Sequence, residues 1–211
     1  MRYFTADLHL GDKTIARWRG FGDDLAAHDA MILQRLNERV GSDDELWLLG
    51  DLCTARVDDV TAMRNAIACN TVHVIVGNHD SRSKFVTCGL FASVEYYGEV
   101  GRYKRDGYKF VMSHYPMLDW DRAYHGSFML HGHIHSLPAN AGEGAERAPL
   151  DAHNGGMGMR GYNAWNAEHG VRRFDVGVDA NGYAPVSAEE ILAALPGDEQ
   201  WSEMHHGLPV D

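Results

Sequence analysis

Residues 72–80 read VHVIVGNHD, an apolar run that ends in a glycine and three polar residues. The run is short, rich in β-branched residues and bounded by a turn signal, which predicts a buried strand. Asn78, His79 and Asp80 follow the run where that strand would end. The ends of parallel strands gather at one edge of a sheet, where α/β proteins assemble their sites. This stretch therefore predicts a sheet and the place of a functional site.

The same arrangement of an apolar run followed by polar residues occurs four more times along the chain. The residues that follow these runs are Asp7 and His9, then Asp51, then His114, and finally His133 and His135. Carboxylate, imidazole and amide groups are ligands for divalent transition metals. Each cluster alone is as readily explained by a turn or a structural pair, but five in succession after apolar runs indicate a metal site.

The segments between the clusters indicate the class of fold. We expect strands at 2–6, 45–49 and 72–76, separated by amphipathic helices at 26–40 and 57–69. This β-α-β-α-β pattern favours parallel strands with helices packed on the sheet. Further strands are expected at 94–97, 100–104, 108–112, 128–130 and 174–178, with a hairpin turn at 105–107. Ser187 is predicted to begin a helix, with Glu190 completing a capping box.

The stretch 138–170 has neither a helical nor a strand period and is rich in Gly, Ala and Asn. We interpret it as an insertion within a single domain of residues 1–211, with 197–211 as a loosely held tail. Loops this long are often functional. Residues 154–165 could form a lid in which Tyr162 and Trp165 stack on the substrate. An ordered excursion packed on the sheet, or a contact between copies of the chain, is an equal alternative.

Composition limits the possible partners and location. The 211 residues are enough for one sizeable core. Eight of the 30 acidic residues follow Phe174 and no Lys or Arg does, so the net charge of −11 is mostly C-terminal. Tight nonspecific nucleic-acid binding is not favoured, because it requires clustered Lys and Arg. No signal peptide or membrane span is visible, and three irregularly spaced cysteines fit a reduced compartment, so we expect a cytoplasmic protein.

Phosphate ester hydrolysis matches the ligand types in these clusters. The anionic oxygens of the ester repel nucleophiles, and two divalent ions about 3.5–4 Å apart overcome this by acidifying a bridging water and clamping the phosphoryl oxygens. Such a centre needs carboxylates, imidazoles and an amide from several strand ends.

The motif series from residue 7 to residue 135 resembles the calcineurin-like metallophosphoesterase superfamily, with the motifs in that family's order. Residues 174–179, FDVGVD, also resemble the closing strand of its small microbial and phage-type members. The resemblance implies a four-layer α-β-β-α sandwich of two mixed sheets flanked by helices. The metal site would lie at the C-terminal ends of the strands.

The resemblance also implies a role for each motif residue. Asp7, His9 and His135 would hold the first metal, Asn78, His114 and His133 would hold the second, and Asp51 would bridge both. His79 would donate a proton to the leaving oxygen or bind phosphate, and Asp80 would orient His79. Imidazole and carboxylate ligands suit two ions of Mn, Fe, Zn or Ni, with Mn as our working choice.

Two features lie outside this ligand set. Four arginines near the motifs, Arg17, Arg19, Arg82 and Arg122, could bind the phosphate or the rest of the substrate. Relatives often carry Gly-His after the first motif, whereas this chain has Gly11-Asp12.

We therefore expect a metal-dependent phosphoesterase that uses in-line attack by a metal-bridging hydroxide, with a phosphodiester or small nucleotide as the favoured substrate. A phosphomonoesterase or protein phosphatase, and a nuclease, are alternatives that need the same metal core. A binding module without catalysis is least favoured, because the ligand positions, His79 and Asp80 are all present.

Overall fold

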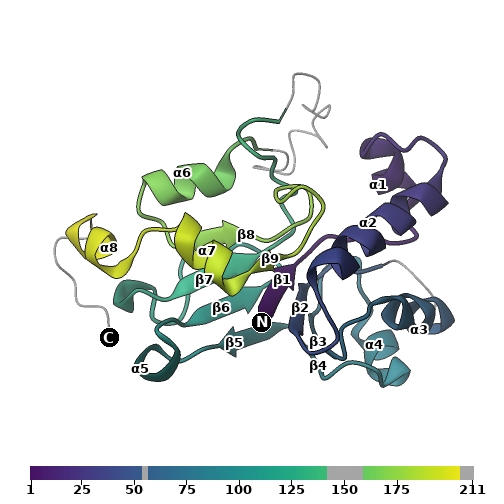
Figure 1. The fold of residues 1–211 in the computed structure, drawn as a ribbon, viewed down its shortest axis with the longest axis horizontal. Coiled ribbons are helices and arrows are strands. Elements are labelled where there is room, and N and C mark those ends of the chain that lie inside the picture. The colour runs from purple at the N-terminus through teal and green to yellow at the C-terminus, as the bar shows by residue number, and fades with distance from the viewer. Residues whose placement is uncertain (54–56, 142–158, 205–211) are drawn as a thin grey trace.

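A computed structural model describes residues 1–53, 57–141 and 159–204 as two stacked β-sheets with helices on the outer sides (Figure 1). The first sheet has the order β4-β3-β2-β1-β9, with strands at Ser93–Glu95, Thr71–Ile75, Glu45–Leu49, Arg2–Thr5 and Val186–Ser187. The second has the order β5-β6-β7-β8, with strands at Tyr97–Val100, Phe110–Ser113, Phe128–His131 and Arg173–Asp175. Both sheets are mixed, because only β9 and β5 run antiparallel to their neighbours.

Side-chain alternation along the central strands builds two cores. In β1, Tyr3 packs against the helices on the outer face of the first sheet, whereas Phe4 packs between the two sheets. In β2, Leu48 likewise packs against the outer helices and Leu49 packs between the two sheets. Successive side chains of a strand point to opposite faces, so an unbroken apolar run buries both faces of the sheet.

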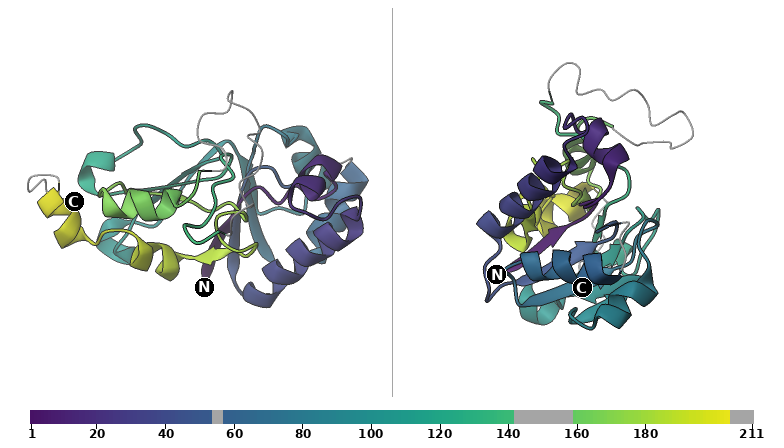
Figure 2. Two further views of the ribbon diagram at one scale, coloured as in Figure 1. Left: turned by 90° about the horizontal axis from the view of Figure 1, so that it is seen from above. Right: turned by 90° about the vertical axis from the view of Figure 1, so that its right-hand side faces the viewer.

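Helices form the two outer layers, which flank the sheets in the views of Figure 2. On the first sheet lie α2 (Leu25–Arg39), α3 (Val57–Ala66) and α4 (Arg82–Cys88), preceded by α1 (Lys13–Trp18). On the side of the second sheet lie α6 (Tyr162–Glu168), α7 (Ala188–Ala194) and α8 (Asp198–Met204). The expected four-layer sandwich is therefore confirmed. The capping box at the start of α7 is also present, formed by Ser187 and Glu190.

Several element predictions were wrong. The stretch 94–97 divides between β4 and β5, which belong to different sheets. A short helix, α5 (Tyr103–Asp106), replaces the strand expected at 100–104 and the turn at 105–107, although β5 and β6 still pair antiparallel. The helix expected at 57–69 ends at Ala66. The strand expected at 174–178 ends at Asp175, after which Gly177 bridges to Ala6 of the other sheet.

The irregular stretch 138–170 contains α6, which the sequence did not predict. Residues 142–158 lie outside the described ranges, and they include 154–158 of the expected lid. Tyr162 is buried and contacts His131, and the Trp165 ring stacks on His169 at 4.2 Å between centroids. Each of these two aromatic residues therefore contacts a histidine of the described fold. None of the helices in the described ranges is both long enough and apolar enough to cross a membrane.

Candidate metal centre

The nine predicted site residues meet where the strands of both sheets end. Asp7 and His9 follow β1, Asp51 follows β2, residues 78–80 follow β3, His114 follows β6, and His133 and His135 follow β7. The Ala6–Gly177 bridge joins the two sheets at this edge. The site is thus shared by both sheets, and residues separated by up to 128 positions are brought together by the topology.

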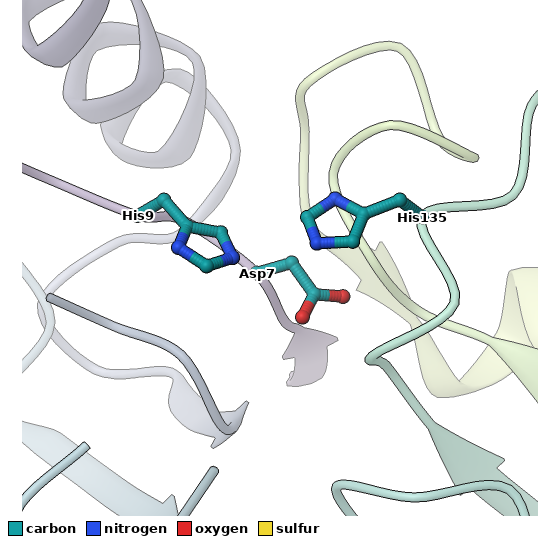
Figure 3. A group of neighbouring side chains, drawn as sticks. All are labelled: Asp7, His9 and His135. Carbon is teal, nitrogen blue, oxygen red and sulfur yellow. The ribbon is translucent and has the colours of Figure 1, made fainter. Parts of the chain in front are cut away.

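Asp7, His9 and His135 form the first group of candidate ligands. One potential ligand atom from each lies within 4.8 Å of the others, and all three side chains are buried. Figure 3 shows the Asp7 carboxylate between the two imidazoles. The imidazole rings of His9 and His135 stack with centroids 5.1 Å apart. Two imidazoles and a carboxylate within this distance can hold one transition metal ion.

A second group adjoins the first through its carboxylates. Asp7, Asp51 and His114 also offer ligand atoms within 4.8 Å of one another. The Asn78 side-chain oxygen lies 2.8 Å from His114 Nε2 and 3.0 Å from His133 Nδ1, so both imidazoles point at one place. Asp51 Oδ2 lies 3.4 Å from His114 Nε2 and 3.6 Å from His9 Nε2. Asp51 therefore stands between the two groups.

The His9 imidazole gives the most direct indication that these residues fit a metal. Both of its ring nitrogens are buried and neither has a hydrogen-bond partner among the described residues. Buried polar groups in proteins are almost always hydrogen-bonded, so an unpartnered pair needs an explanation. Burial lowers the pKa of His9 to about 2, which keeps the ring neutral. A neutral imidazole facing two carboxylates has the form and the neighbours of a metal ligand.

Backbone strain is concentrated at the same positions. Within the described ranges, seven non-glycine residues have a positive φ, and five of these are Asp7, His9, Asp51, His133 and His135, with values from 46° to 73°. A positive φ is uncommon for non-glycine residues and usually marks a turn or a constrained site. Such strain clusters at functional sites, where it fixes side-chain direction. Here it turns the side chain at each strand end toward the common centre.

Two glycines allow the close approach of these loops. A Cβ atom on Gly77 would lie 2.2 Å from Asp51 Oδ1, and one on Gly50 would lie 2.2 Å from His114 Nδ1. Both distances are far below van der Waals contact, so any side chain at these positions would displace a candidate ligand. The Gly50-Asp51 and Gly77-Asn78 pairs are therefore a steric requirement of the site.

The electrostatics of the centre favour a bound cation. Burial raises the pKa of Asp7 to about 7. Burial also opposes ionisation of Asp51, but hydrogen bonding and charge attraction from His114 outweigh it and lower the Asp51 pKa to about 2. Burial alone would lower the pKa of His114, yet contacts with Asp51 and Asp7 raise it to about 9. The buried carboxylates thus attract positive charge. Near neutral pH, protons bound to Asp7 and His114 supply that charge.

His79 and Asp80 differ from the ligand candidates. The His79 side chain is exposed, and its ring packs edge-on against His9 with centroids 5.1 Å apart. Asp80 was expected to orient His79, but the structure shows other partners for its carboxylate. It accepts hydrogen bonds from the backbone N–H groups of Asp51 at 2.8 Å, Leu52 at 3.0 Å and Gly77 at 2.9 Å. The carboxylate therefore ties the loop after β2 to the loop after β3.

Of the four arginines proposed to bind substrate, Arg19 cannot do so. Its guanidinium is buried against Asp179, with Nη2–Oδ2 at 2.8 Å. Arg17 pairs with Asp23 at the surface. Arg82 is exposed beside an open groove of about 700 Å³ that begins at Asp80. Asp12, which stands where relatives carry histidine, caps α1, and its Oδ2 atom lies 3.8 Å from His9 Nδ1.

The sequence analysis missed two buried carboxylates behind the centre. Asp179 Oδ2 lies 2.7 Å from His135 Nδ1. Asp175 accepts hydrogen bonds from the backbone and hydroxyl of Ser136 and from the Gly177 N–H. Asp179 follows the apolar run 174–178, so the signal that identified the ligands could also have identified this residue.

Comparison with known proteins agrees with this geometry. A family model described as calcineurin-like phosphoesterase matches residues 3–187. Two relatives are the Gene 66 protein of Mycobacterium phage L5, 26% identical over 163 residues with 64% of this chain and 77% of that protein covered, and the Gene 66 protein of Mycobacterium phage D29, 29% identical over 160 residues with 64% and 78% covered.

Among solved structures, a protein of unknown function from Aquifex aeolicus has a similar fold. It superposes with a TM-score of 0.60 at 20% identity, over 90% of this chain and 97% of that one. This likeness concerns the fold alone. The family model spans most of the chain and the phage relatives are of similar length, so the chain belongs to the calcineurin-like phosphoesterase family as a small, phage-type member.

Proposed function

We propose that this chain is a dinuclear-metal phosphoesterase that favours phosphodiesters or small nucleotides. Membership of the family supports a metal-dependent phosphoesterase in general. The observation that carries the proposal for this centre is the His9 imidazole, which is buried with both nitrogens unpartnered between Asp7, Asp51 and His135.

The proposed ligand assignment is the one that the family resemblance implies, and the two groups of neighbouring side chains support it. Asp7, His9 and His135 would hold one ion, and Asn78, His114 and His133 would hold the other. Asp51, which stands between the groups, would contact both. Two divalent ions there would supply a nucleophile from water at neutral pH and neutralise charge on the phosphoryl oxygens.

The chain's own residues would carry the remaining work. His79 is exposed at the rim and belongs to neither group, so its ring is free to donate a proton to the departing oxygen. Asp80 would hold the loops that carry Asp51 and His79. The strained backbone at the five ligand positions would keep the ligands directed at the centre before substrate arrives.

The open groove next to the loop after β3 supports a substrate with a sizeable leaving group. It starts at Asp80 and is lined by Ser81, Arg82 and Tyr96 among others. A diester carries an organic group on the leaving side that could occupy this groove, and Arg82 could bind an anionic part of it. A phosphomonoesterase or protein phosphatase and a nuclease remain the alternative activities.

The test combines metal analysis with a substrate panel. The purified protein is stripped with a chelator, reloaded with Mn²⁺, and assayed on bis(p-nitrophenyl) phosphate and p-nitrophenyl phosphate. We expect two ions per chain, loss of activity on stripping, recovery on reloading, and a higher kcat/KM for the diester. A protein that holds two ions but cleaves no phosphate monoester, diester or nucleic acid would be a binding module instead. A preference for the monoester would overturn the substrate assignment alone.

A further inference from the structure

A buried ion pair lies directly behind the first group of candidate ligands. Asp179 and Arg19 have fully buried side chains, and Arg19 binds the carboxylate through both Nε, at 3.1 Å, and Nη2, at 2.8 Å. Buried ion pairs are weak evidence for stability, because desolvation offsets much of their attraction. The contacts of this pair with the candidate ligands suggest another role.

Asp179 determines which nitrogen of His135 is available to a metal. Its Oδ2 atom lies 2.7 Å from Nδ1 of the imidazole. A carboxylate can only accept a hydrogen bond, so Nδ1 must carry the hydrogen. Nε2 is then left with its lone pair as the atom that can bind a metal beside Asp7 and His9. Metal-binding histidines are commonly oriented by a carboxylate in this way.

Arg19 holds the turn that carries the other two ligands. Its Nη2 atom donates to the carbonyl oxygen of Asp7 at 2.6 Å, and its Nη1 atom donates to that of Leu8 at 3.0 Å. Asp7 and His9 have φ values of 58° and 50°, which the isolated chain would rarely adopt. One guanidinium therefore fixes the strained turn and, through Asp179, the orientation of His135.

The candidate ligands of the second ion are held mainly by other parts of the chain, although the backbone N–H of His133 donates to the Asp7 carboxylate at 3.0 Å. His114 Nδ1 lies 2.9 Å from the Leu49 carbonyl oxygen, and His133 meets His114 and Tyr115 edge-on. A change at Asp179 or Arg19 should therefore alter the binding of one ion more than the binding of the other.

We propose that Asp179 and Arg19 are positioning residues that pre-organise Asp7, His9 and His135 for the first metal. This inference rests on the proposed dinuclear centre. It assigns a role to two residues that are not themselves ligands, and it predicts that their loss weakens one metal site selectively.

The test is stepwise metal binding to the full-length Asp179→Asn variant. Titration calorimetry with Mn²⁺ measures the two dissociation constants, and Co²⁺ quenching of Trp18 fluorescence identifies the first site. Trp18 is a local reporter because its ring lies edge-on to His135, with centroids 5.1 Å apart; subtracting the signal of Trp18→Phe isolates it. We expect the first site to weaken by about 10–100-fold, as when other residues that support a metal ligand are changed. The second dissociation constant should stay within about twofold.

A control separates this effect from the loss of a carboxylate that pairs with a buried arginine elsewhere in the chain. Arg172 is also buried and pairs at 2.7 Å with Asp198, which is partly exposed at the start of α8. Asp198→Asn should leave both dissociation constants unchanged. Circular dichroism and urea unfolding of the metal-free proteins establish that each variant folds.

Each outcome decides the inference. Wild-type binding at both sites of folded Asp179→Asn would overturn it, and so would equal weakening of both sites. If that variant does not fold, Arg19→Lys replaces it, because lysine keeps the charge but cannot make the same set of contacts. Selective weakening of the first site by Arg19→Lys supports the inference, and unchanged binding overturns it. A wild-type protein that binds no Mn²⁺ would instead refute the proposed function.

Discussion

The Asp80→Asn substitution distinguishes two roles for a carboxylate beside the centre. The family pattern assigns Asp80 to orienting His79, whereas the folded chain shows Asp80 accepting three short backbone hydrogen bonds. Those N–H groups belong to Asp51, Leu52 and Gly77, at 2.8, 3.0 and 2.9 Å. A loop-fixing role affects the stability of the metal-free protein, and an orienting role does not.

The expected magnitude follows from these contacts. Asparagine retains one oxygen, which can serve the N–H groups of Asp51 and Gly77, while its NH₂ group then faces the N–H of Leu52. One hydrogen bond is lost and two change from charged to neutral acceptors. Bonds to charged groups contribute about 1.5–3 kcal/mol each, but the burial that raises the pKa of Asp80 to about 6 offsets part of this contribution. We expect a decrease of about 2–3 kcal/mol in the free energy of unfolding.

Urea unfolding of the chelator-treated proteins at pH 7 measures this change. The control is Asp24→Asn, which removes the same charge from the N-cap of α2, where the side chain accepts one N–H. Asparagine is as good an N-cap as aspartate, so the control should stay within about 0.5 kcal/mol of wild type. If Asp80→Asn also stays within that range, the loop-fixing role is refuted.

Three further predictions concern the centre itself. His79→Ala should lower kcat by about 10²–10⁴-fold while elemental analysis still finds two metals per chain; loss of metal would contradict its role outside the ligand set. Metal binding at pH 7 should release between about one and two protons, because Asp7 with a pKa of about 7 is half protonated and His114 with a pKa of about 9 carries a proton. Calorimetry in two buffers of different ionisation enthalpy measures that release, and the affinity should rise with pH from 6 to 8; a flat profile would show that neither group titrates on binding. Gly77→Ala should weaken metal binding at least about tenfold, since the new Cβ would lie 2.2 Å from Asp51 Oδ1. If the variant binds metal with wild-type affinity, the loop can move without displacing the ligand.

The sequence predicted the elements whose pattern is local. β1, β2, β3 and β7 were placed to within a residue or two, because an unbroken apolar run followed by a turn residue is characteristic of a strand buried on both faces. The helix α2 was found for the same reason, since its apolar spacing continues over fifteen residues. Four-layer packing itself came from the family resemblance, because no local pattern reports how two sheets stack.

The elements that were missed are short or depend on distant contacts. α5 and α6 have four and seven residues, too few for a helical period to emerge. The division of 94–97 between two sheets depends on pairing with Val74 on one side and Ser113 on the other, which the segment's own residues do not encode. Local patterns likewise could not show that Arg19 would be buried with Asp179, 160 residues away.

The candidate site shows the same division. Strand ends marked the predicted ligands, and the fold brings them together. The backbone contacts of Asp80 could not be predicted, because N–H groups of the loops after β2 and β3 carry no sequence signature. Its role in orienting His79 stays a prediction. Behind the ligands, Asp179 carries the same sequence signal, but its contacts with Arg19 and His135 can be recognised only from the folded chain.

Anomalous diffraction from a crystal grown with Mn²⁺ tests the central claim most directly. We predict two peaks about 3.5–4 Å apart, as in other two-metal sites, with Asp51 in contact with both. Asp7, His9 and His135 should contact one peak, and Asn78, His114 and His133 the other. A single peak, or two peaks elsewhere with His9 still unpartnered, would contradict the dinuclear centre.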